Sequence, residues 1–292
     1  MPELVYVNGA FVPRSEAKIS VGDHGFLYGY GVFQSLRSYN GKLFLLDKHL
    51  KLLYKAAEVI GMRFKLEGLD LEKVFNDIVK VNNLKEARVR LTVTNGENPA
   101  LPWSDASGPP NIVASAVPYT PFPPEKYEAG FKIGIASLRR MKQSVLSSIK
   151  SVNYLLNVIV RMEAAGKGWD ETLLLNDVGF IAEGGGSNVF FVKNGGLLTP
   201  PPDSGIIPGV TREVVMELAA GLGIKVEEKD IKPSDLGRFN EAFMTNSMME
   251  IMPVVFVVDE KGKVIEIGDG KPGAITRRLM AAYKDKVAKE TA

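Results

Sequence analysis

Lys150 is the basic residue whose position in the sequence most favours chemistry. It follows a loop of small hydroxyl residues and precedes an apolar-periodic stretch that predicts a helix from about 151 to 165. A lysine beside a helix N-terminus feels the positive end of the helix dipole, which together with burial would favour a neutral, nucleophilic amine. Such an amine can form a Schiff base. The alternative is an ordinary solvated lysine in a loop.

Glu183 opens a glycine run, since residues 183–188 read EGGGSN. Glycine lets the backbone approach a ligand closely, and a carboxylate beside it could partner a cationic ring nitrogen. The alternative is a loose turn with an exposed glutamate. The run is neither a dinucleotide fingerprint, because no third glycine at the required spacing and no helix follow, nor a G-x-S-x-G nucleophile elbow.

Two further segments place polar groups where an anion could bind. Thr211 follows Pro-Gly and is predicted to cap a helix over 212–221, whose free N–H groups would suit a phosphate dianion. Ordinary capping is the alternative there. Ser247 ends a strand predicted over 241–245, and it could either donate to an anion or form a simple turn.

The two histidines are interpreted as structural residues. His24 would suit a catalytic triad only with a nucleophile motif elsewhere, and we find none. His49 lies on a predicted helix that Asp47 could cap. Because the chain has no cysteine and its two histidines are far apart, we expect no metal site.

Composition narrows the class of protein. The chain has 292 residues, 45% of them hydrophobic, and 36 Lys and Arg against 34 Asp and Glu give a formal charge of +2. This balance argues against nucleic acid or an anionic membrane as the main partner. No run of ~20 apolar residues occurs and the first residues do not resemble a signal peptide, so we expect a cytoplasmic protein.

The predicted elements form an α+β pattern in two parts. Asn8-Gly9 and Asn40-Gly41 predict hairpin turns, and period-two alternation predicts a strand over 87–94. A proline-rich segment reads as a stiff connector. We therefore predict an N-terminal α+β domain over 1–117, a linker over 118–125 and a C-terminal cofactor-binding domain over 126–292.

Four features together resemble one family in order and spacing. They are Lys150 before an Asn-Tyr helix start, Glu183 followed by Gly-x-x-Asn-Val-Phe after one residue, Leu-Thr-Pro at 198–200, and Pro-Gly-Val-Thr-Arg at 208–212. The chain resembles class IV, fold-type IV pyridoxal-phosphate enzymes, which include branched-chain aminotransferase, D-amino-acid aminotransferase and 4-amino-4-deoxychorismate lyase. The resemblance spans nearly the whole chain. It implies the D-amino-acid aminotransferase-like two-domain fold, with a smaller α+β N-terminal domain and a larger, mixed β-barrel-like C-terminal domain.

The resemblance implies that pyridoxal 5'-phosphate is bound as a Schiff base by Lys150, which then moves a proton during the reaction. Glu183 would pair with the ring nitrogen and keep it protonated, which makes the ring an electron sink. The family is homodimeric, with pocket residues that cross from the partner subunit, so we expect a homodimer. The other implied roles are the phosphate-binding helix start (Val210, Thr211), the strand-end turn (Ser247, Met248), the ring-backing side chain (Ile207) and the substrate pocket (Tyr28, Phe33, Arg37, Tyr154).

The chain departs from the family at two places. Most relatives carry a phosphate-binding arginine where Leu52 stands here, and Lys48 or Lys55, on the same helical face, could supply that charge instead. The loop 95–102 also lacks the Arg-x-His carboxylate trap of D-amino-acid aminotransferase. Specificity of that type is therefore not expected.

We predict an aminotransferase that moves an amino group between a branched-chain or small amino acid and a 2-oxo acid. The alternative is 4-amino-4-deoxychorismate lyase, which forms 4-aminobenzoate and pyruvate, because the segments 23–29 and 244–254 resemble such lyases. A third possibility is a non-catalytic ligand-binding relative, suggested by Leu52. A loop over 95–110 is expected to cover the pocket.

Overall fold

The computed structural model describes residues 3–62, 66, 68–98 and 108–292, and contacts divide the chain into two compact units. The first unit comprises 1–120, 149–154 and 289–292, and the second comprises 121–148 and 155–288. The change at residue 120 falls within the segment where the sequence predicts a linker. The return of 149–154 to the first unit is not foreseen by the sequence, and the predicted domains themselves stay a prediction. Most of the predicted covering loop lies outside the described residues.

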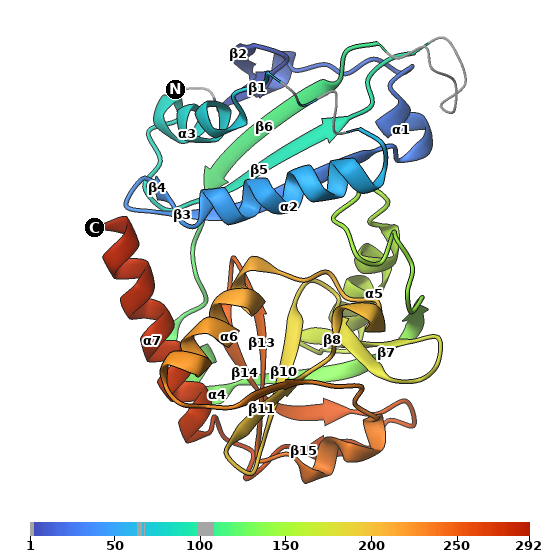
Figure 1. Cartoon of the computed structure of the whole chain (residues 1–292), viewed down its shortest axis with the longest axis vertical. Coiled ribbons are helices and arrows are strands. Elements are labelled where there is room, and N and C mark those ends of the chain that lie inside the picture. The colour runs from blue at the N-terminus through green and yellow to red at the C-terminus, as the bar shows by residue number, and fades with distance from the viewer. Residues whose placement is uncertain (1–2, 63–65, 67, 99–107) are drawn as a thin grey trace. The chain divides into compact units, whose positions relative to one another are not determined.

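The first unit is built on a six-stranded antiparallel sheet with the strand order β2-β1-β6-β5-β3-β4 (Figure 1). Its strands are β1 (Leu4–Val7), β2 (Ala10–Pro13), β3 (Gly31–Tyr39), β4 (Lys42–Leu43), β5 (Ala87–Thr94) and β6 (Asn111–Pro118). Its helices are α1 (His24–Tyr28), α2 (Leu46–Val59) and α3 (Leu71–Val81), with a 3₁₀ turn at Arg14–Glu16.

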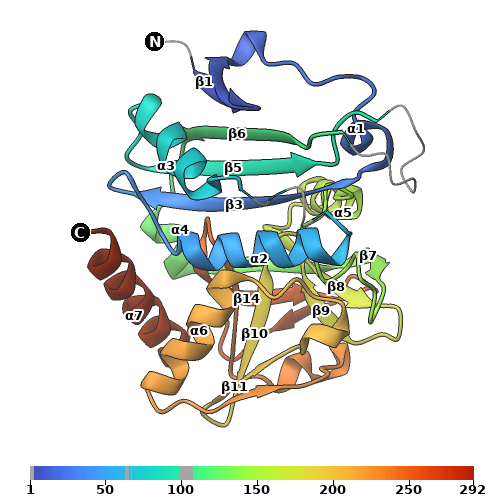
Figure 2. The same cartoon turned by 45° about the horizontal axis from the view of Figure 1, so that its top comes forward.

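Both predicted hairpin turns form at Asn-Gly. Asn8 and Asn40 have positive φ, as do the glycines that follow them, which is the backbone that a two-residue hairpin requires. Alternation in β5 buries Val89, Leu91 and Val93 on one face. That face packs against α2 along β3 and against α3 across β1, β5 and β6 (Figure 2). The opposite face carries Phe33, Ser35 and Arg37 in β3, opposite Arg90 and its neighbours in β5.

Helix α2 starts one residue before the predicted cap. Leu45 is its N-cap and has a left-handed backbone with φ 55°, so Asp47 lies inside the first turn. A carboxylate there still interacts favourably with the positive end of the helix dipole. One face of the helix is apolar, with Leu53 and Ala57 fully buried.

The second unit contains a mixed nine-stranded sheet with the order β12-β11-β10-β13-β14-β7-β8-β9, and β15 pairs with β14. Strand β7 runs parallel to its two neighbours, β14 and β8. Strand β12 runs parallel to β11. The strands are β7 (Phe131–Arg140), β8 (Glu171–Asn176), β9 (Ile181–Gly184), β10 (Asn188–Lys193), β11 (Gly196–Thr199), β12 (Val226–Glu228), β13 (Glu241–Asn246), β14 (Glu250–Val258) and β15 (Val264–Glu266). The helices are α4 (Pro124–Ala129), α5 (Leu155–Gly166), α6 (Val210–Gly221) and α7 (Ala274–Thr291), with 3₁₀ turns at Pro202–Ser204 and Pro233–Arg238.

The second unit has its own apolar core. Phe191, Met244, Met252 and Val257 are among its fully buried members. Helix α5 packs on β7 and β8, whereas α6 packs on β13. The core therefore fixes the strands that carry polar residues such as Glu183 on β9 and Asn246 on β13.

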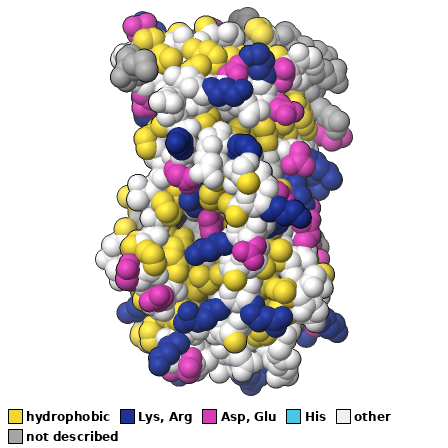
Figure 3. All heavy atoms as spheres, turned by 90° about the vertical axis from the view of Figure 1, so that its left-hand side faces the viewer, with side chains coloured by type: hydrophobic (Ala, Val, Ile, Leu, Met, Phe, Trp, Pro, Cys, Tyr) yellow, Lys and Arg dark blue, Asp and Glu magenta, His cyan; other side chains and the backbone are white. Residues whose placement is uncertain are grey.

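The surface carries charges of both signs. On the face drawn in Figure 3, Lys and Arg side chains are interspersed with Asp and Glu. In the part of the chain that the structure describes, no helix is long and apolar enough to cross a membrane. The expectation that nucleic acid and membranes are not partners stays a prediction.

Candidate active site

Lys150 lies on a strand-like segment attached to β3, and the prediction that it borders a helix start is wrong. Its carbonyl oxygen accepts the N–H of Phe33 at 2.9 Å, and Ser151 forms an antiparallel bridge with Val32. Helix α5 begins only at Leu155. Because the dipole effect fades within the first turn of a helix, α5 does not act on Lys150. Ile149 is buried in the core of the first unit and anchors the segment.

Two of the predicted pocket residues lie next to Lys150. The Lys150 ammonium nitrogen is 5.7 Å from the centre of the Phe33 ring. That ring is buried and meets the Tyr154 ring edge-on, with centroids 5.2 Å apart. The lysine amine therefore has an aromatic wall on at least one side, within a single unit.

Arg90 joins this cluster, although the sequence analysis did not select it. Its guanidinium carbon lies 3.7 Å over the Phe33 ring, and its Nε donates to Thr92 Oγ1 at 3.2 Å. Burial lowers the pKa of Arg90 from its usual value, with the nearby Tyr154 opposing that change. Arginine remains cationic in proteins. The alternation of 87–94 puts Arg90 on the less buried face, but only the register of β5 against β3 places it beside Phe33.

Arg37, which is predicted to line the pocket, takes part in a different cluster. It forms an ion pair with Glu86 at 3.0 Å, and its guanidinium lies over the rings of Tyr39 and Tyr119 at 4.1 and 4.8 Å. It is four residues further along β3 than Phe33, which at about 3.3 Å per residue is roughly 13 Å. A role for Arg37 in substrate binding stays a prediction.

His49 is fully buried on α2. Its Nδ1 lies 3.3 Å from Gln34 Oε1 on β3. Burial, and then the charge of Lys150, lower the pKa of His49 to about 3. A neutral imidazole is therefore held close to the charge of Lys150 at ordinary pH.

Tyr28 is half-exposed on the short helix α1. Its ring meets the His24 ring edge-on at 5.3 Å, and His24 is fixed by Asn95 Nδ2 and the Asn98 carbonyl, each 3.2 Å from a ring nitrogen. The interpretation of His24 as a hydrogen-bonded structural residue is thus confirmed. Lys48 on α2 is half-buried, whereas Lys55 is exposed.

Glu183 is buried and held at several points, so the alternative of an exposed glutamate in a loose turn is wrong. Arg140 Nη1 lies 2.8 Å from Glu183 Oε1, and the other carboxylate oxygen accepts the Ile207 N–H at 2.9 Å and Asn188 Nδ2 at 3.2 Å. Charge-assisted bonds of this kind stabilise the ionised form. The sequence carries no local signal for Arg140, because only the sheet brings β7 near β9.

Helix α6 is capped by Gly209 rather than by the predicted Thr211. Val210 and Thr211 are its first two residues, and both are buried. Gly209 has no side chain to accept the N–H groups of the first turn, and a Cβ at this position would lie 2.6 Å from Asn188 Oδ1. The start of α6 therefore keeps the backbone donors that suit an anion.

The strand-end turn is organised by Asn246. Its Oδ1 accepts the N–H groups of Met248 and Met249 at 2.9 and 2.8 Å. In the described part of the chain, the buried hydroxyls of Ser187 and Thr245 have no protein partner. Such hydroxyls are satisfied by a ligand or by water. Polar atoms around Glu183 and the β13 turn therefore fit a bound polar group.

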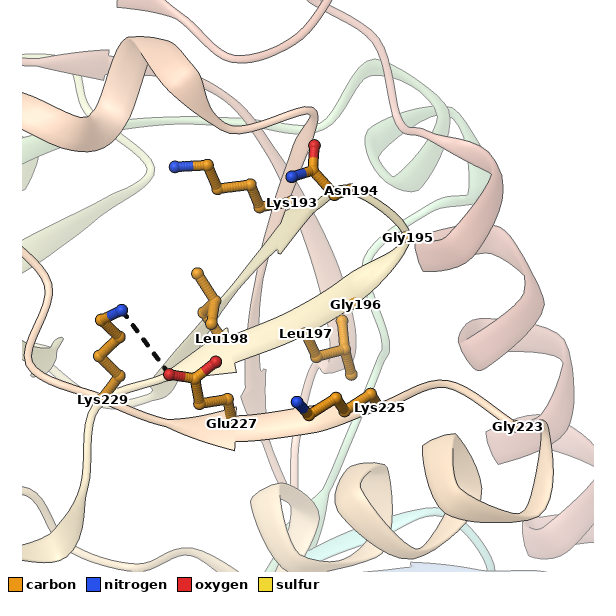
Figure 4. Close-up of a pocket in the computed structure, with 10 residues that line it drawn as sticks. All are labelled: Lys193, Asn194, Gly195, Gly196, Leu197, Leu198, Gly223, Lys225, Glu227 and Lys229. Atoms are coloured by element: carbon orange, nitrogen blue, oxygen red, sulfur yellow. Dashed lines mark ion pairs between the residues drawn. The ribbon is translucent and has the colours of Figure 1, made fainter.

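A separate groove of about 420 Å³ lies beside β10, β11 and β12 (Figure 4). Its charged lining residues are Lys193, Lys225, Glu227 and Lys229, and Lys229 pairs with Glu227 at 3.6 Å. None of the predicted site residues lines it. Among the described residues, no group of three or more acidic or histidine side chains could hold a metal ion.

The sequence of this chain is similar to proteins of one family. The sequence pattern described as amino-transferase class IV matches residues 31–257. A putative branched-chain-amino-acid aminotransferase of Methanocaldococcus jannaschii is 40% identical over 96% of this chain and 95% of its own length. The aminodeoxychorismate lyase of Bacillus subtilis is 31% identical over 97% of this chain and 94% of its own length.

Solved structures agree with the sequence comparison. The branched-chain aminotransferase of the thermophilic archaeon Thermoproteus uzoniensis, determined with norvaline, is similar with a TM-score of 0.85 at 29% identity. The similarity covers 99% of this chain and 96% of that one. Another similar branched-chain amino acid aminotransferase was determined with pyridoxamine 5'-phosphate. The predicted fold type IV is confirmed.

Proposed function

The chain belongs to the class IV aminotransferases, which use pyridoxal 5'-phosphate, and we propose that its substrates are branched-chain or small amino acids and 2-oxo acids. The buried Glu183 carboxylate, fixed by Arg140, is the observation that best supports the chemistry. The substrate class is supported by 40% identity to a protein named as a putative branched-chain aminotransferase.

The cofactor fits the residues present. When bound, it withdraws electrons from the substrate carbon that carries the amino group. Lys150 would hold it covalently, Glu183 would meet its ring nitrogen, and Ile207 would pack against its ring. We propose that its phosphate is held by the α6 start and the β13 turn (Val210, Thr211, Ser247, Met248), with Lys48 or Lys55 as the cation.

Each group in the first unit then has a separate task. The amine of Lys150 takes and returns the proton at the substrate carbon, because a lysine at the aromatic cluster can lose its proton whereas Arg90 stays cationic. Phe33 and Tyr154 exclude water from that amine. The guanidinium of Arg90 over Phe33 is suited to a substrate carboxylate, since arginine binds carboxylates in a bidentate manner.

We propose a homodimer, which the apolar exposed surface supports. On α1, Phe26, Leu27 and Tyr28 are exposed, although large apolar side chains are usually buried. On α5, Leu155 and Met162 are each 68% exposed. Apolar side chains that gather on one exposed face mark interaction surfaces. A subunit contact through α1 would agree with the implied crossing of pocket residues from a partner subunit.

We also propose a cytoplasmic location, where free amino acids and 2-oxo acids are both available. Lyase activity toward 4-amino-4-deoxychorismate is the second candidate function. It is favoured by the 31% identity to a lyase over nearly the whole chain. The two reactions share the cofactor and Lys150, and they differ in the bond that breaks afterwards.

The test follows the visible absorbance of the cofactor-loaded protein during additions of single amino acids, without any 2-oxo acid. Loss of the cofactor's visible band with leucine, isoleucine or valine would establish transamination and the donor class. A band that no amino acid changes, together with pyruvate release from aminodeoxychorismate, would establish the lyase. A protein that takes up no cofactor would favour the non-catalytic relative.

A further inference from the structure

Glu171 is a buried acid outside the groups to which the proposed chemistry assigns a task. It is the first residue of β8 and is 6% exposed. Its carboxylate accepts the N–H of Thr172 at 3.0 Å and lies against Gly185 and Gly186, whose backbone N–H groups lower its pKa. The Arg161 guanidinium on α5 is the cation that interacts with it. A buried carboxylate is thus directed at the glycine run that follows Glu183.

The carboxylate of Glu171 lies where the backbone pairing between β8 and β9 ends. Strands β8 and β9 are antiparallel, and the pairing Leu173↔Gly184 is the one closest to the glycine run. In an antiparallel ladder the next donors would be met by backbone carbonyls of the neighbouring strand. Here the carboxylate of Glu171 lies beside Gly185 and Gly186 instead. The run therefore leaves the sheet next to a buried acceptor side chain.

The remaining peptide groups of the run are also engaged. Asn157 Nδ2 on α5 donates to the Gly185 carbonyl at 2.9 Å, and Asn246 Nδ2 on β13 donates to the Gly186 carbonyl at 3.0 Å. The Gly184 N–H donates to the Ser187 carbonyl at 2.6 Å. The carbonyls of the run are therefore held by α5 and β13, while the Glu171 carboxylate of β8 lies against its backbone.

Gly185 is required by this contact. A Cβ at Gly185 would lie 2.8 Å from Thr172 Oγ1 and 2.9 Å from Glu171 Oε1. Contacts under 3.0 Å force atoms to move, so a side chain at Gly185 would push Thr172 or the Glu171 carboxylate away from the run. The glycine thus allows the backbone to approach Glu171 closely.

We propose that Glu171 is a positioning residue: by holding the glycine run, it sets the carboxylate of Glu183 before the run and the hydroxyl of Ser187 after it. This inference rests on the proposed function, because it assigns the two ends of the run to the cofactor and substrate side. Glu171 touches neither the cofactor nor the reacting atoms. Its effect is transmitted through the backbone from 184 to 187.

The electrostatics support a functional reason for this acid. Burial raises the pKa of Glu171, and the N–H donors and Arg161 only partly oppose that effect. The ionised side chain is therefore unfavourable for folding compared with an exposed glutamate. Groups that cost stability are concentrated at functional sites.

The main test replaces Glu171 by Gln, with Glu163→Gln as the matched control. Glu163 is on α5, where it pairs with Lys167 and accepts from Ser137. In Glu171→Gln an amide NH₂ replaces one acceptor oxygen and faces the glycine donors, so the run shifts. We expect kcat to fall roughly 10- to 100-fold with KM for the amino donor changed less, since small misplacements near a reacting centre have effects of that size.

A second readout does not depend on turnover. The pH at which the absorbance band of the bound cofactor titrates should shift in Glu171→Gln, because Glu183 would meet the ring nitrogen differently, and should stay unchanged in Glu163→Gln. An unchanged band and unchanged kcat in Glu171→Gln would overturn the proposal, as would an equal loss in both variants. If the parent protein binds cofactor but transfers no amino group, the spectral comparison still decides the role of Glu171 while the proposed reaction fails.

Two further variants guard against a folding defect. Glu171→Asp keeps the charge and should recover part of the lost kcat. Gly185→Ala leaves Glu171 intact but displaces the run, and it should reproduce the spectral shift of Glu171→Gln. A folded Gly185→Ala protein with the parent spectrum would contradict the proposed path from Glu171 to Glu183.

Discussion

The backbone carbonyl of Lys150 accepts the backbone N–H of Phe33 at 2.9 Å, so strand β3 positions the lysine. The Val152 N–H donates to Gly31 at 3.0 Å, and Asn153 Nδ2 donates to Gly29 at 2.8 Å. Three consecutive attachments therefore hold the segment against the first unit. The amine is presented from a segment bonded to a strand of the sheet, which favours precise positioning.

The Arg140–Glu183 pair should be essential both for stability and for chemistry. Glu183→Gln leaves the buried Arg140 without its anionic partner, so the free energy of unfolding should fall by about 3 kcal/mol. Denaturant unfolding of the cofactor-free protein measures this change. A double variant with Arg140→Met removes both charges and should regain most of the stability but none of the activity. Equal stability of Glu183→Gln and the parent protein would contradict the buried pair.

The neutral His49 makes stability depend on pH. The pKa of His49 is about 3 in the folded protein against 6.5 in an unfolded chain, so below pH 6.5 the unfolded state binds a proton that the folded state lacks. Stability should therefore fall as the pH falls from 6.5 toward 3, by ~2 kcal/mol between pH 7 and pH 5. His49→Gln should remove this part of the slope in the cofactor-free protein. The same slope in variant and parent would show that His49 is not the titrating group.

The cation that replaces the arginine expected at position 52 should be found on the same helix. Lys48 is half-buried and Lys55 exposed, so we expect Lys48→Ala to weaken pyridoxal phosphate binding more, by roughly tenfold. Titration of the cofactor-free variants by fluorescence quenching measures this affinity. Lys80→Ala, on α3, is the control. Unchanged affinity in both Lys48→Ala and Lys55→Ala would exclude this helix as the source of the charge.

The exposed apolar face of α5 should hold the proposed homodimer together. Met162→Lys places a charge on that face, and light scattering should then report a smaller mass than for the parent protein. Val178→Lys alters a similarly exposed side chain in the turn between β8 and β9 and should leave the mass unchanged. A dimeric Met162→Lys protein would move the contact away from α5.

Local signals in the sequence predicted the local elements well. Asn8-Gly9 and Asn40-Gly41 favour positive φ whatever the rest of the chain does, and the alternating segment 87–94 forms β5 with the expected bounds. The motif around Glu183 likewise identified a residue that proves to be buried and fixed. Such features depend on neighbouring residues in the sequence, so they can be predicted from the sequence alone.

Contacts between segments that are distant in the sequence could not be predicted from the sequence. Arg140 meets Glu183 only because β7, β8 and β9 are adjacent in the sheet, and Arg90 meets Phe33 only through the register of β3 and β5. Thr211 looked like a helix cap, but the close approach of Asn188 makes Gly209 the cap. In each case a tertiary contact overrides or completes a local preference.

Borohydride reduction of the cofactor-loaded protein reveals whether Lys150 binds the cofactor covalently. The loaded protein is reduced, digested and mapped by mass spectrometry. We expect a pyridoxyl group on the peptide that contains Lys150, and none in Lys150→Ala, while Lys142→Ala retains it. A pyridoxyl group on another lysine, or none on the reduced parent protein, would exclude Lys150 as the attachment site.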